Sequence, residues 1–395
     1  MPKPSTCIAN AAFGKYRWVI RLMSGLILKW KFNYKTMHIP VIRTNKSRLA
    51  AYDFTNIQFG PNPTDHLFTA DYQNGEWTNA EVKPFGEFLI SPLALCLHYG
   101  QTVFEGMKAF RVADGGVSIF RRDKHLLRLN RSLERMCMPA VPEALFYEAL
   151  DALVGLDEGW VSGLTGNSLY LRPIVIASEV RLGVLEANAY KFMIVALPMA
   201  NYYDGTVKVK VETEYTRAAK GGAGFAKCGG NYGGAFLPTR LARQAGFDQV
   251  LWTDGDTHSY IEESGTMNVM FAINGTLITP PLNGTILDGV NRDSILTLAK
   301  DRGMTTEERP IGYQELETAF KNGAEIEAFG VGTAAVLTQI REIDILGQSY
   351  FPVTPNDGIA ASLRDELNAI RTGRLPDRYG WNHLVASPEK AELAE

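Results

Sequence analysis

One lysine in the chain stands in a setting that could make it a nucleophile. Lys227 lies inside a glycine-rich segment, GGAGFAKCGGNYGG (221–234), between Ala226 and Cys228. Small and apolar neighbours disfavour the charged form of an amine, so we expect the pKa of Lys227 to fall. A lysine that is partly neutral near pH 7 can attack an aldehyde and form a Schiff base. Tyr232, five residues later, adds a phenol that can donate a hydrogen bond to an adjacent oxygen.

Two further glycine clusters, LDGVNR around Gly289 and FGVGT at 329–333, could also approach a ligand closely. The second matches the GxGxxG/A pattern of dinucleotide sites. Such a site needs an acidic residue about 20 positions later, where this chain has Tyr350. We therefore reject a dinucleotide site, although a turn with Thr333 can still offer N–H groups and a hydroxyl to a phosphate. Taken singly, each cluster could also be a plain surface turn.

The composition narrows the classes of protein that remain. The 395 residues are 46% hydrophobic and 21% charged, which is typical of a globular chain and excludes disorder. The net charge of −3 gives no reason to expect nucleic-acid binding. No run reaches the roughly 18 apolar residues of a membrane span. The four cysteines form no CxxC pair and the six histidines no HExxH motif, so we predict no metal site.

The amino-terminal segment is basic and carries no acidic residue before Asp53. That composition fits an organelle presequence. The segment has few serines, however, and Arg21 and Lys29 interrupt its apolar stretches. We therefore favour an extension over 1–37, with Met23 or Met37 as the true start.

The elements that must position these residues alternate between strands and helices. Segments rich in β-branched and aromatic residues predict strands at 168–177, 190–197 and 207–211. Helical spacing of apolar residues predicts helices at 122–137, 143–155 and 292–302. The turn-rich segment 199–205 marks a boundary. We predict a mixed α/β (α+β) protein with a small α/β domain at 38–199, a connector at 200–208 and a large cofactor-binding α/β domain at 209–395.

Several of these segments together resemble a known enzyme family. GGAGFAKCGGNY, QVLWTDGDTHSYIEESGTMNVMF, LDGVNRDSIL and FGVGTA resemble the branched-chain amino acid aminotransferases, which are pyridoxal-phosphate enzymes of fold type IV. The likeness continues upstream through LHYGQTVFEGMKAF, FRRDKHLLRL and SLYLRPIVIA, and covers roughly residues 50–375 in order. It implies the two-domain fold type IV architecture, with the cofactor, pyridoxal 5'-phosphate, in the cleft between the domains.

The resemblance also assigns roles to residues around the cofactor ring. It implies that Lys227 is the Schiff-base lysine and moves a proton between the substrate α-carbon and the cofactor C4′. Glu263, counted back from GTMN, would face the pyridine nitrogen and keep it protonated. Its neighbour Glu262 is the alternative. The GTMN spacing favours Glu263, which leaves Glu262 as a solvated charge. Tyr232 would bond the cofactor 3′-oxygen, and Thr266 would lie beside the ring.

The phosphate is expected at a helix amino-terminus, where unpaired N–H groups favour an anion. The resemblance implies that it meets Arg128, Thr333 and the backbone N–H groups of Val290 and Asn291. Without the resemblance, Arg128 would be predicted as a solvent-facing charge on an amphipathic helix.

The substrate pocket must accept both a branched aliphatic side chain and the acidic side chain of glutamate. Apolar walls suit the branched aliphatic side chain. An arginine or a tyrosine hydroxyl suits the side-chain carboxylate of glutamate, which would otherwise be buried without a partner. Leu182 and Val184 resemble residues that reach into the neighbouring subunit's pocket, so a homodimer is expected. Positions that match the family suggest these residues as the lining of the substrate pocket: Phe59, Tyr99, Phe104, Tyr170, Arg172 and Ala334.

The resemblance predicts a transaminase that converts L-leucine, L-isoleucine or L-valine and 2-oxoglutarate to the branched 2-oxo acid and L-glutamate. A D-amino acid aminotransferase or an aminodeoxychorismate lyase is the alternative within the same fold. A regulatory protein without turnover is disfavoured, because Lys227 and Glu263 are both present. Where some animal mitochondrial members carry a CxxC pair after the GxGT turn, this chain has Ala335 and Thr338, so thiol regulation of that kind is not expected. The bacterial-type composition of this loop, together with the doubtful leader, favours a cytoplasmic location. A mitochondrial location stays open through the basic leader.

Overall fold

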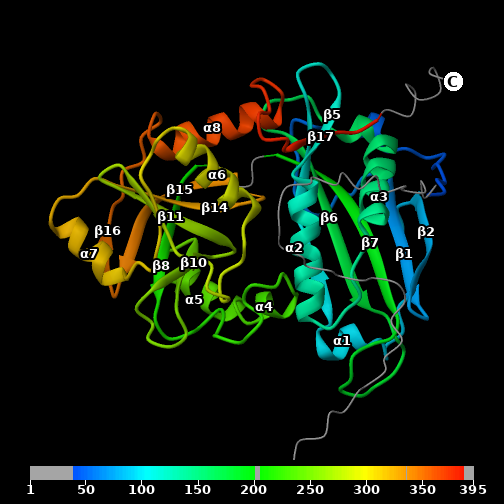
Figure 1. Ribbon diagram of the computed structural model, residues 1–395, viewed down its shortest axis with the longest axis horizontal. Coiled ribbons are helices and arrows are strands. Elements are labelled where there is room, and N and C mark those ends of the chain that lie inside the picture. Colours follow the sequence, from blue (N-terminus) through cyan, green and yellow to red (C-terminus); the bar gives the residue numbers. More distant parts are fainter. Residues whose placement is uncertain (1–38, 201–204, 335, 387–395) are drawn as a thin grey trace, which may run out of the picture. The chain divides into compact units, whose positions relative to one another are not determined.

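The computed structural model describes residues 39–200, 205–334 and 336–386. The predicted extension at 1–37 lies outside these residues. Two β-sheets with helices packed against them make up the described part of the chain (Figure 1). Across those ranges, no helix combines the length and the apolar character needed to span a membrane.

The first sheet is antiparallel and has the strand order β17-β5-β4-β6-β7-β1-β2, with β3 paired to β6. Its centre is the long pair β6–β7, which is paired over ten residue positions. Its strands are β1 (His66–Gln73), β2 (Glu76–Pro84), β3 (Thr102–Phe104), β4 (Met107–Arg111), β5 (Val117–Phe120), β6 (Ser168–Ala177), β7 (Tyr190–Met199) and β17 (Asn382–Leu384).

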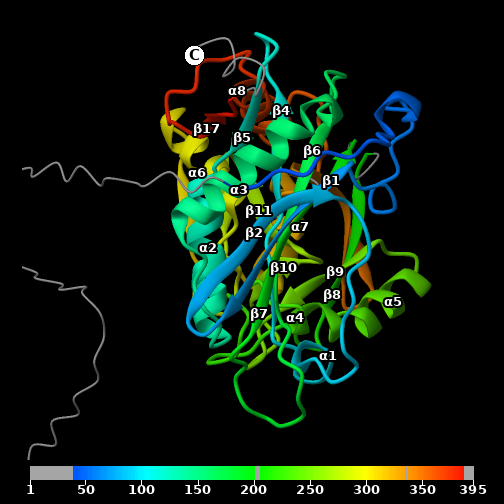
Figure 2. The ribbon, with the colours of Figure 1, turned by 90° about the vertical axis from the view of Figure 1, so that its right-hand side faces the viewer.

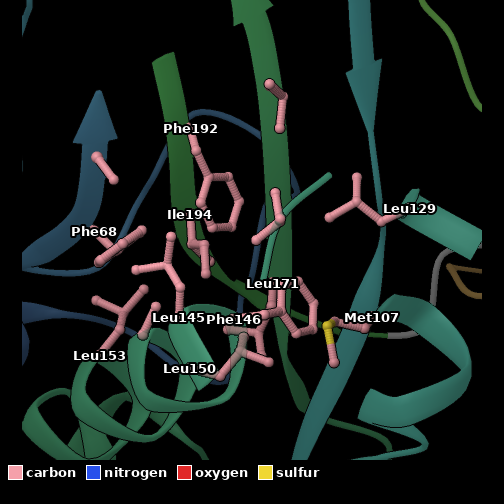
Figure 3. Close-up of a cluster of buried hydrophobic side chains, with 14 of the residues drawn as sticks. Phe68, Met107, Leu129, Leu145, Phe146, Leu150, Leu153, Leu171, Phe192 and Ile194 are labelled. Carbon is pink, nitrogen blue, oxygen red and sulfur yellow. The ribbon is translucent and has the colours of Figure 1, made fainter. Parts of the chain in front are cut away.

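Helix α3 (Glu143–Leu156) covers the side of this sheet formed by β1, β2 and β7, as Figures 1 and 2 show. Apolar residues recur along α3 at helical spacing, and this face is buried. Figure 3 shows Phe146, Leu150 and Leu153 packed with Phe192 and Ile194 of β7. The other helices of this part are the short α1 (Leu95–Tyr99), α2 (Arg122–Arg135) and the 3₁₀ turns Leu49–Ala51 and Glu158–Trp160.

The second sheet mixes parallel and antiparallel pairs in the order β10-β9-β8-β15-β14-β11-β12-β13, with β16 paired to β15. Strand β10 also pairs with β11, so the path from β10 through β8 and β14 to β11 closes on itself. Its strands are β8 (Val207–Glu212), β9 (Gln249–Thr253), β10 (Ile261–Ser264), β11 (Met267–Ile273), β12 (Thr276–Thr279), β13 (Thr306–Glu308), β14 (Ile326–Gly332), β15 (Val336–Ile345) and β16 (Gln348–Tyr350).

Helices cover this sheet as well. Helices α6 (Val290–Asp301) and α8 (Ile359–Arg371) contact each other and β14, and their apolar faces form one buried cluster (Figure 1). Helix α5 (Phe236–Gln244) contacts β8 and β9 (Figure 2). The remaining helices of the described residues are α4 (Gly230–Gly233) and α7 (Tyr313–Lys321).

The predicted mixed α/β class is confirmed. Strand β6 has the predicted limits, and β7 and β8 extend two residues and one residue beyond the predicted ends. Helix α6 begins at Val290 rather than at the predicted 292. The chain changes sheet between β7 and β8, near the predicted connector, but β17 returns to pair with β5 of the first sheet. The division into domains at these boundaries stays a prediction.

Candidate active site

A cavity of about 420 Å³ lies among residues from both sheets. This volume is within the range of small-molecule sites. The glycine-rich loop, the start of α6 and the β14–β15 turn all contribute to its lining. It brings together these predicted residues: Phe59, Phe104, Arg128, Tyr170, Arg172, Lys227, Tyr232, Glu263, Thr266, Val290, Asn291, Thr333 and Ala334.

Lys227 is held by its own backbone between two neighbouring elements. Its N–H donates to the hydroxyl of Ser132 on α2 (2.9 Å), and its carbonyl accepts from the N–H of Phe104 on β3 (3.0 Å). The side-chain Nζ donates to the hydroxyl of Tyr232 at 3.0 Å and lies 4.9 Å from the centre of the Phe104 ring. The amine therefore has a fixed position on the wall of the cavity, with a phenol beside it.

The two adjacent glutamates of β10 point to different places, because neighbouring residues in a strand face opposite sides. Glu263 lines the cavity, accepts the N–H of Leu287 (2.8 Å) and pairs with Arg217 (3.2 Å). Glu262 instead accepts the hydroxyl of Thr285 and lines a different hollow. Burial raises the pKa of Glu263, although the charge of Arg217 opposes this shift.

Arg128 is a buried cation with a carboxylate partner. Its Nε and Nη2 donate to the two oxygens of Glu105 (2.7 and 2.8 Å), and Nη1 donates to the carbonyl of Asp288 (3.0 Å). Since a guanidinium has five N–H bonds, one hydrogen on each Nη remains for a ligand. His125 also binds Glu105, at 2.8 Å. Burial by itself would raise the pKa of Glu105, but Arg128 and His125 hold it well below its usual range.

The start of α6 presents free backbone donors to the cavity. The first N–H that bonds within the helix is that of Asp293, to the carbonyl of Gly289 (3.0 Å). The N–H groups of Val290 and Asn291 therefore have no partner inside the helix. A side chain at Gly289 would lie 1.9 Å from the Asn268 amide oxygen, so glycine is required for this close approach.

The opposite part of the cavity is aromatic with one arginine. Phe59 and Tyr170 form an edge-to-face pair with ring centres 5.1 Å apart. Arg172 donates to the Tyr170 hydroxyl (2.8 Å) and lies over the Phe104 ring at 4.6 Å. Among the described residues, no acceptor binds the buried Nε of Arg172. A Cβ atom at Gly106 would lie 2.1 Å from the Tyr170 hydroxyl, so the tyrosine packs directly on that backbone.

Three residues predicted at a binding site lie away from this cavity. Tyr99 was predicted as a pocket wall, but its hydroxyl accepts the N–H of Gly183 (3.1 Å) and the residue is 43% exposed. Leu182 and Val184 belong to the same surface and are 58% and 83% exposed. Tyr99 is thus not brought into the cavity of its own chain, because α1 carries it to the surface beside the 180–185 segment.

Comparison with known proteins identifies the family. The model of the family amino-transferase class IV matches residues 102–343. The branched-chain-amino-acid aminotransferase 2 of Bacillus subtilis is 40% identical over 358 residues, which cover 89% of this chain and 98% of that protein. This chain belongs to the class IV aminotransferases, in the branched-chain amino acid aminotransferase family.

Solved structures agree with this assignment. The Thermoproteus uzoniensis branched-chain aminotransferase with norvaline is 26% identical with a TM-score of 0.66, and the match covers 81% of this chain and 100% of that one. The T.th. branched-chain amino acid aminotransferase, complexed with N-(5'-phosphopyridoxyl)-L-glutamate, is 29% identical with a TM-score of 0.64, over 80% of this chain and 98% of that one. The predicted fold type IV architecture is confirmed, and the aminotransferase uses pyridoxal 5'-phosphate.

The residues of this aminotransferase fit that cofactor chemically. The free N–H groups of Arg128 and of the α6 amino-terminus suit a phosphate. The carboxylate of Glu263 suits a protonated ring nitrogen, and the amine of Lys227 suits an aldehyde. A phosphate at one end, a basic nitrogen and an aldehyde are the groups that pyridoxal phosphate carries.

Three important residues of the aminotransferase were missed by the sequence analysis: Glu105, His125 and Arg217. Glu105 is the only acid in the segment VFEGMKAF, yet nothing in that segment reveals its partner on a helix 23 residues later. Arg217 lies in a loop ten residues before Lys227 and carries no motif. Pairs of this kind are set by the packing of distant elements, which sequence spacing does not report.

Proposed function

We propose that the enzyme transfers the amino group of L-leucine, L-isoleucine or L-valine to 2-oxoglutarate, giving the branched 2-oxo acid and L-glutamate. The observation that carries the proposal is one cavity that holds an amine beside a phenol, a buried carboxylate and an anion seat. These are Lys227 with Tyr232, Glu263, and the donors of Arg128 and α6. The branched-chain names of the relatives support the choice of substrate.

When bound, pyridoxal phosphate supplies an aldehyde carbon that bonds amines and a ring that accepts electrons from the substrate. Lys227 would provide the amine for that aldehyde and then serve as general base and acid at the substrate α-carbon. Glu263 would keep a proton on the ring nitrogen, and Tyr232 would donate to the 3′-oxygen. Thr266 would pack beside the ring.

The phosphate end would be held by charge and by backbone donors together. Arg128 keeps one hydrogen on each Nη for the phosphate, while Glu105 fixes the plane of its guanidinium. The N–H groups of Val290 and Asn291 and the hydroxyl of Thr333 would complete the seat.

The substrate end supports specificity for two kinds of side chain. The rings of Phe59, Phe104 and Tyr170, with Ala334, give an apolar surface for a branched aliphatic group. Arg172 lies against the same rings, and its Nε has no acceptor among the described residues. It would pair with the second carboxylate of glutamate or 2-oxoglutarate, which would otherwise be buried without a partner.

The proposal includes a homodimer. Apolar residues that are 40% exposed or more gather on two adjacent segments, and backbone hydrogen bonds join these segments at Leu93–Arg181 and Leu95–Glu179. A surface of this kind favours a partner. We propose that a second copy covers it and that Leu182, Val184 and Tyr99 complete the partner's site. The exposed residues are Phe85, Phe88, Leu89, Ile90, Leu93, Leu97, Tyr99, Val180, Leu182, Val184 and Leu185.

One assay tests the proposed reaction. Purified protein with added pyridoxal phosphate is mixed with L-leucine and 2-oxoglutarate, and L-glutamate is measured, with D-alanine and aminodeoxychorismate run in parallel. Turnover of leucine, isoleucine and valine is expected. Turnover of D-alanine or aminodeoxychorismate without any turnover of leucine would overturn the proposed substrates. A cytoplasmic location, expected from the sequence, is also part of the proposal, and cell fractionation tests it.

A further inference from the structure

A second arginine is buried behind the phosphate end of the cavity. Arg371, the last residue of α8, is only 2% exposed. Its guanidinium lies against the rings of Phe120 and Phe110, at 4.5 and 5.6 Å. Its Nη2 donates to the amide oxygen of Asn291, while Nε and Nη1 find no acceptor in the described part of the chain. Burial lowers the pKa of Arg371 to about 9, so the group is still protonated at neutral pH.

Lys108 is a second buried cation close to the first. It lies on β4, is 6% exposed, and its Nζ donates to the carbonyl of Ala334 (3.1 Å). Burial and the charge of Arg371 lower the pKa of Lys108 to about 7. Within residues 39–200, 205–334 and 336–386, no carboxylate forms an ion pair with Arg371 or Lys108. At neutral pH Arg371 is charged and Lys108 is about half charged, and buried positive charge of this kind destabilises the protein unless an anion compensates it.

Both cations bind to one wall of the cavity, formed by the first turn of α6 and the turn at 332–334. Asn291 accepts from Arg371 and donates from its Nδ2 to the carbonyl of Gly332 (2.7 Å). The peptide bond after Gly332 is planar and trans, so the N–H of Thr333 points away from that carbonyl. The Asn291 side-chain amide and the Ala334 carbonyl thus turn their oxygens toward Arg371 and Lys108.

We propose that Arg371, acting through Asn291, is a positioning residue that tightens the binding of the cofactor's phosphate, with Lys108 as a second positive charge behind the same wall. The inference rests on the proposed function, since it requires the phosphate to lie at the start of α6. The phosphate is then the counter-ion that both cations lack within the chain.

The proposed role of Arg371 has opposite effects on cofactor affinity and on the stability of the cofactor-free protein. Without cofactor, the buried charge of Arg371 costs stability, because its surroundings are aromatic and cationic. With the phosphate bound, the same charge attracts it through a medium of low dielectric constant. Replacing Arg371 should therefore weaken cofactor binding without weakening the cofactor-free fold. A residue that only supports the structure would lower both.

The experiment compares the cofactor with its dephosphorylated form. Apoenzyme is titrated with pyridoxal 5'-phosphate and with pyridoxal, using tryptophan fluorescence, and its unfolding in urea is measured separately. Arg371→Met removes the charge, and Arg371→Gln removes the charge but keeps a donor for Asn291. Arg374→Met is the matched control, because Arg374 is exposed three residues further on.

We expect both Arg371 variants to bind pyridoxal phosphate about tenfold more weakly than wild type does. Their affinity for pyridoxal should stay within about twofold of the wild-type value. The urea midpoint of the apoenzyme should not fall. If Arg371→Met does not fold, Arg371→Gln alone decides. Equal weakening of both ligands, or no weakening of either, would overturn the inference. Wild-type enzyme that binds pyridoxal phosphate no more tightly than pyridoxal would instead refute the proposed phosphate site itself.

Discussion

Glu105→Gln is the substitution whose effect can be worked out most fully. Glu105 is entirely buried and accepts from Nε and Nη2 of Arg128, from Nδ1 of His125 and from the N–H of Gly106. Glutamine keeps the shape but removes the charge, and its NH₂ group would face a donor. The Arg128 cation then stays buried without a counter-ion. Breaking a buried ion pair in this way costs about 3–5 kcal/mol.

The effect should depend on pH with a definite sign. Because the pKa of Glu105 lies well below its usual range, its stabilisation is fully present above the pKa of the unfolded chain, about 4.3. The stabilisation is lost as the pH falls toward the lowered pKa of the folded state. The difference between wild type and Glu105→Gln should therefore be constant from about pH 5 to pH 8 and shrink below about pH 4.

Urea unfolding of the cofactor-free protein, followed by tryptophan fluorescence, measures this difference. The exposed Glu76→Gln variant is the matched control and should change the free energy of unfolding by less than about 0.5 kcal/mol. A loss below about 1 kcal/mol for Glu105→Gln at pH 7 would refute the role of Glu105 as counter-ion. A difference that persists undiminished at about pH 3 would refute that role as well.

Further substitutions test the other parts of the site. Gly106→Ala places a Cβ 2.1 Å from the Tyr170 hydroxyl, so the ring must move, and kcat/KM for leucine should fall at least about tenfold while cofactor affinity is kept. Unchanged steady-state kinetics would contradict this packing. Tyr232→Phe removes the hydroxyl 3.0 Å from Lys227 and should weaken cofactor binding about tenfold in a fluorescence titration. An affinity equal to that of wild type would exclude a role for the Tyr232 hydroxyl in cofactor binding. Val184→Asp places a charge on the exposed apolar surface and should give a protein that sediments as a monomer and has low activity. A fully active dimer would exclude this surface as the interface.

Local spacing predicted those parts of the site that a single segment carries. Lys227 and Tyr232 are five residues apart, and the first turn of a short helix brings their polar ends together. Glu263 was distinguished from Glu262 by its spacing from GTMN in the family resemblance, and the strand then sends the two neighbours to opposite faces. The helical pattern found α6 but placed its start at 292, two residues after the observed start at Val290.

What depends on distant packing was not predictable. The burial of Arg128 requires Glu105, which lies on a connection between β3 and β4, and the helix pattern alone favoured an exposed charge. Tyr99 was assigned to the cavity by its motif, but it is the last residue of α1, which carries it to the surface beside Gly183. Arg371 is separated from Asn291 by 80 residues, and no motif connects them.

The identity of the lysine that bonds the cofactor tests the account most directly. Holoenzyme is treated with borohydride to fix that bond, digested, and analysed by mass spectrometry. Lys108 is an internal competitor, since it is the more deeply buried amine and its pKa falls to about 7. We predict the cofactor's mass on the peptide that contains Lys227. Labelling of Lys108 or another lysine, with Lys227 unmodified, would contradict the account.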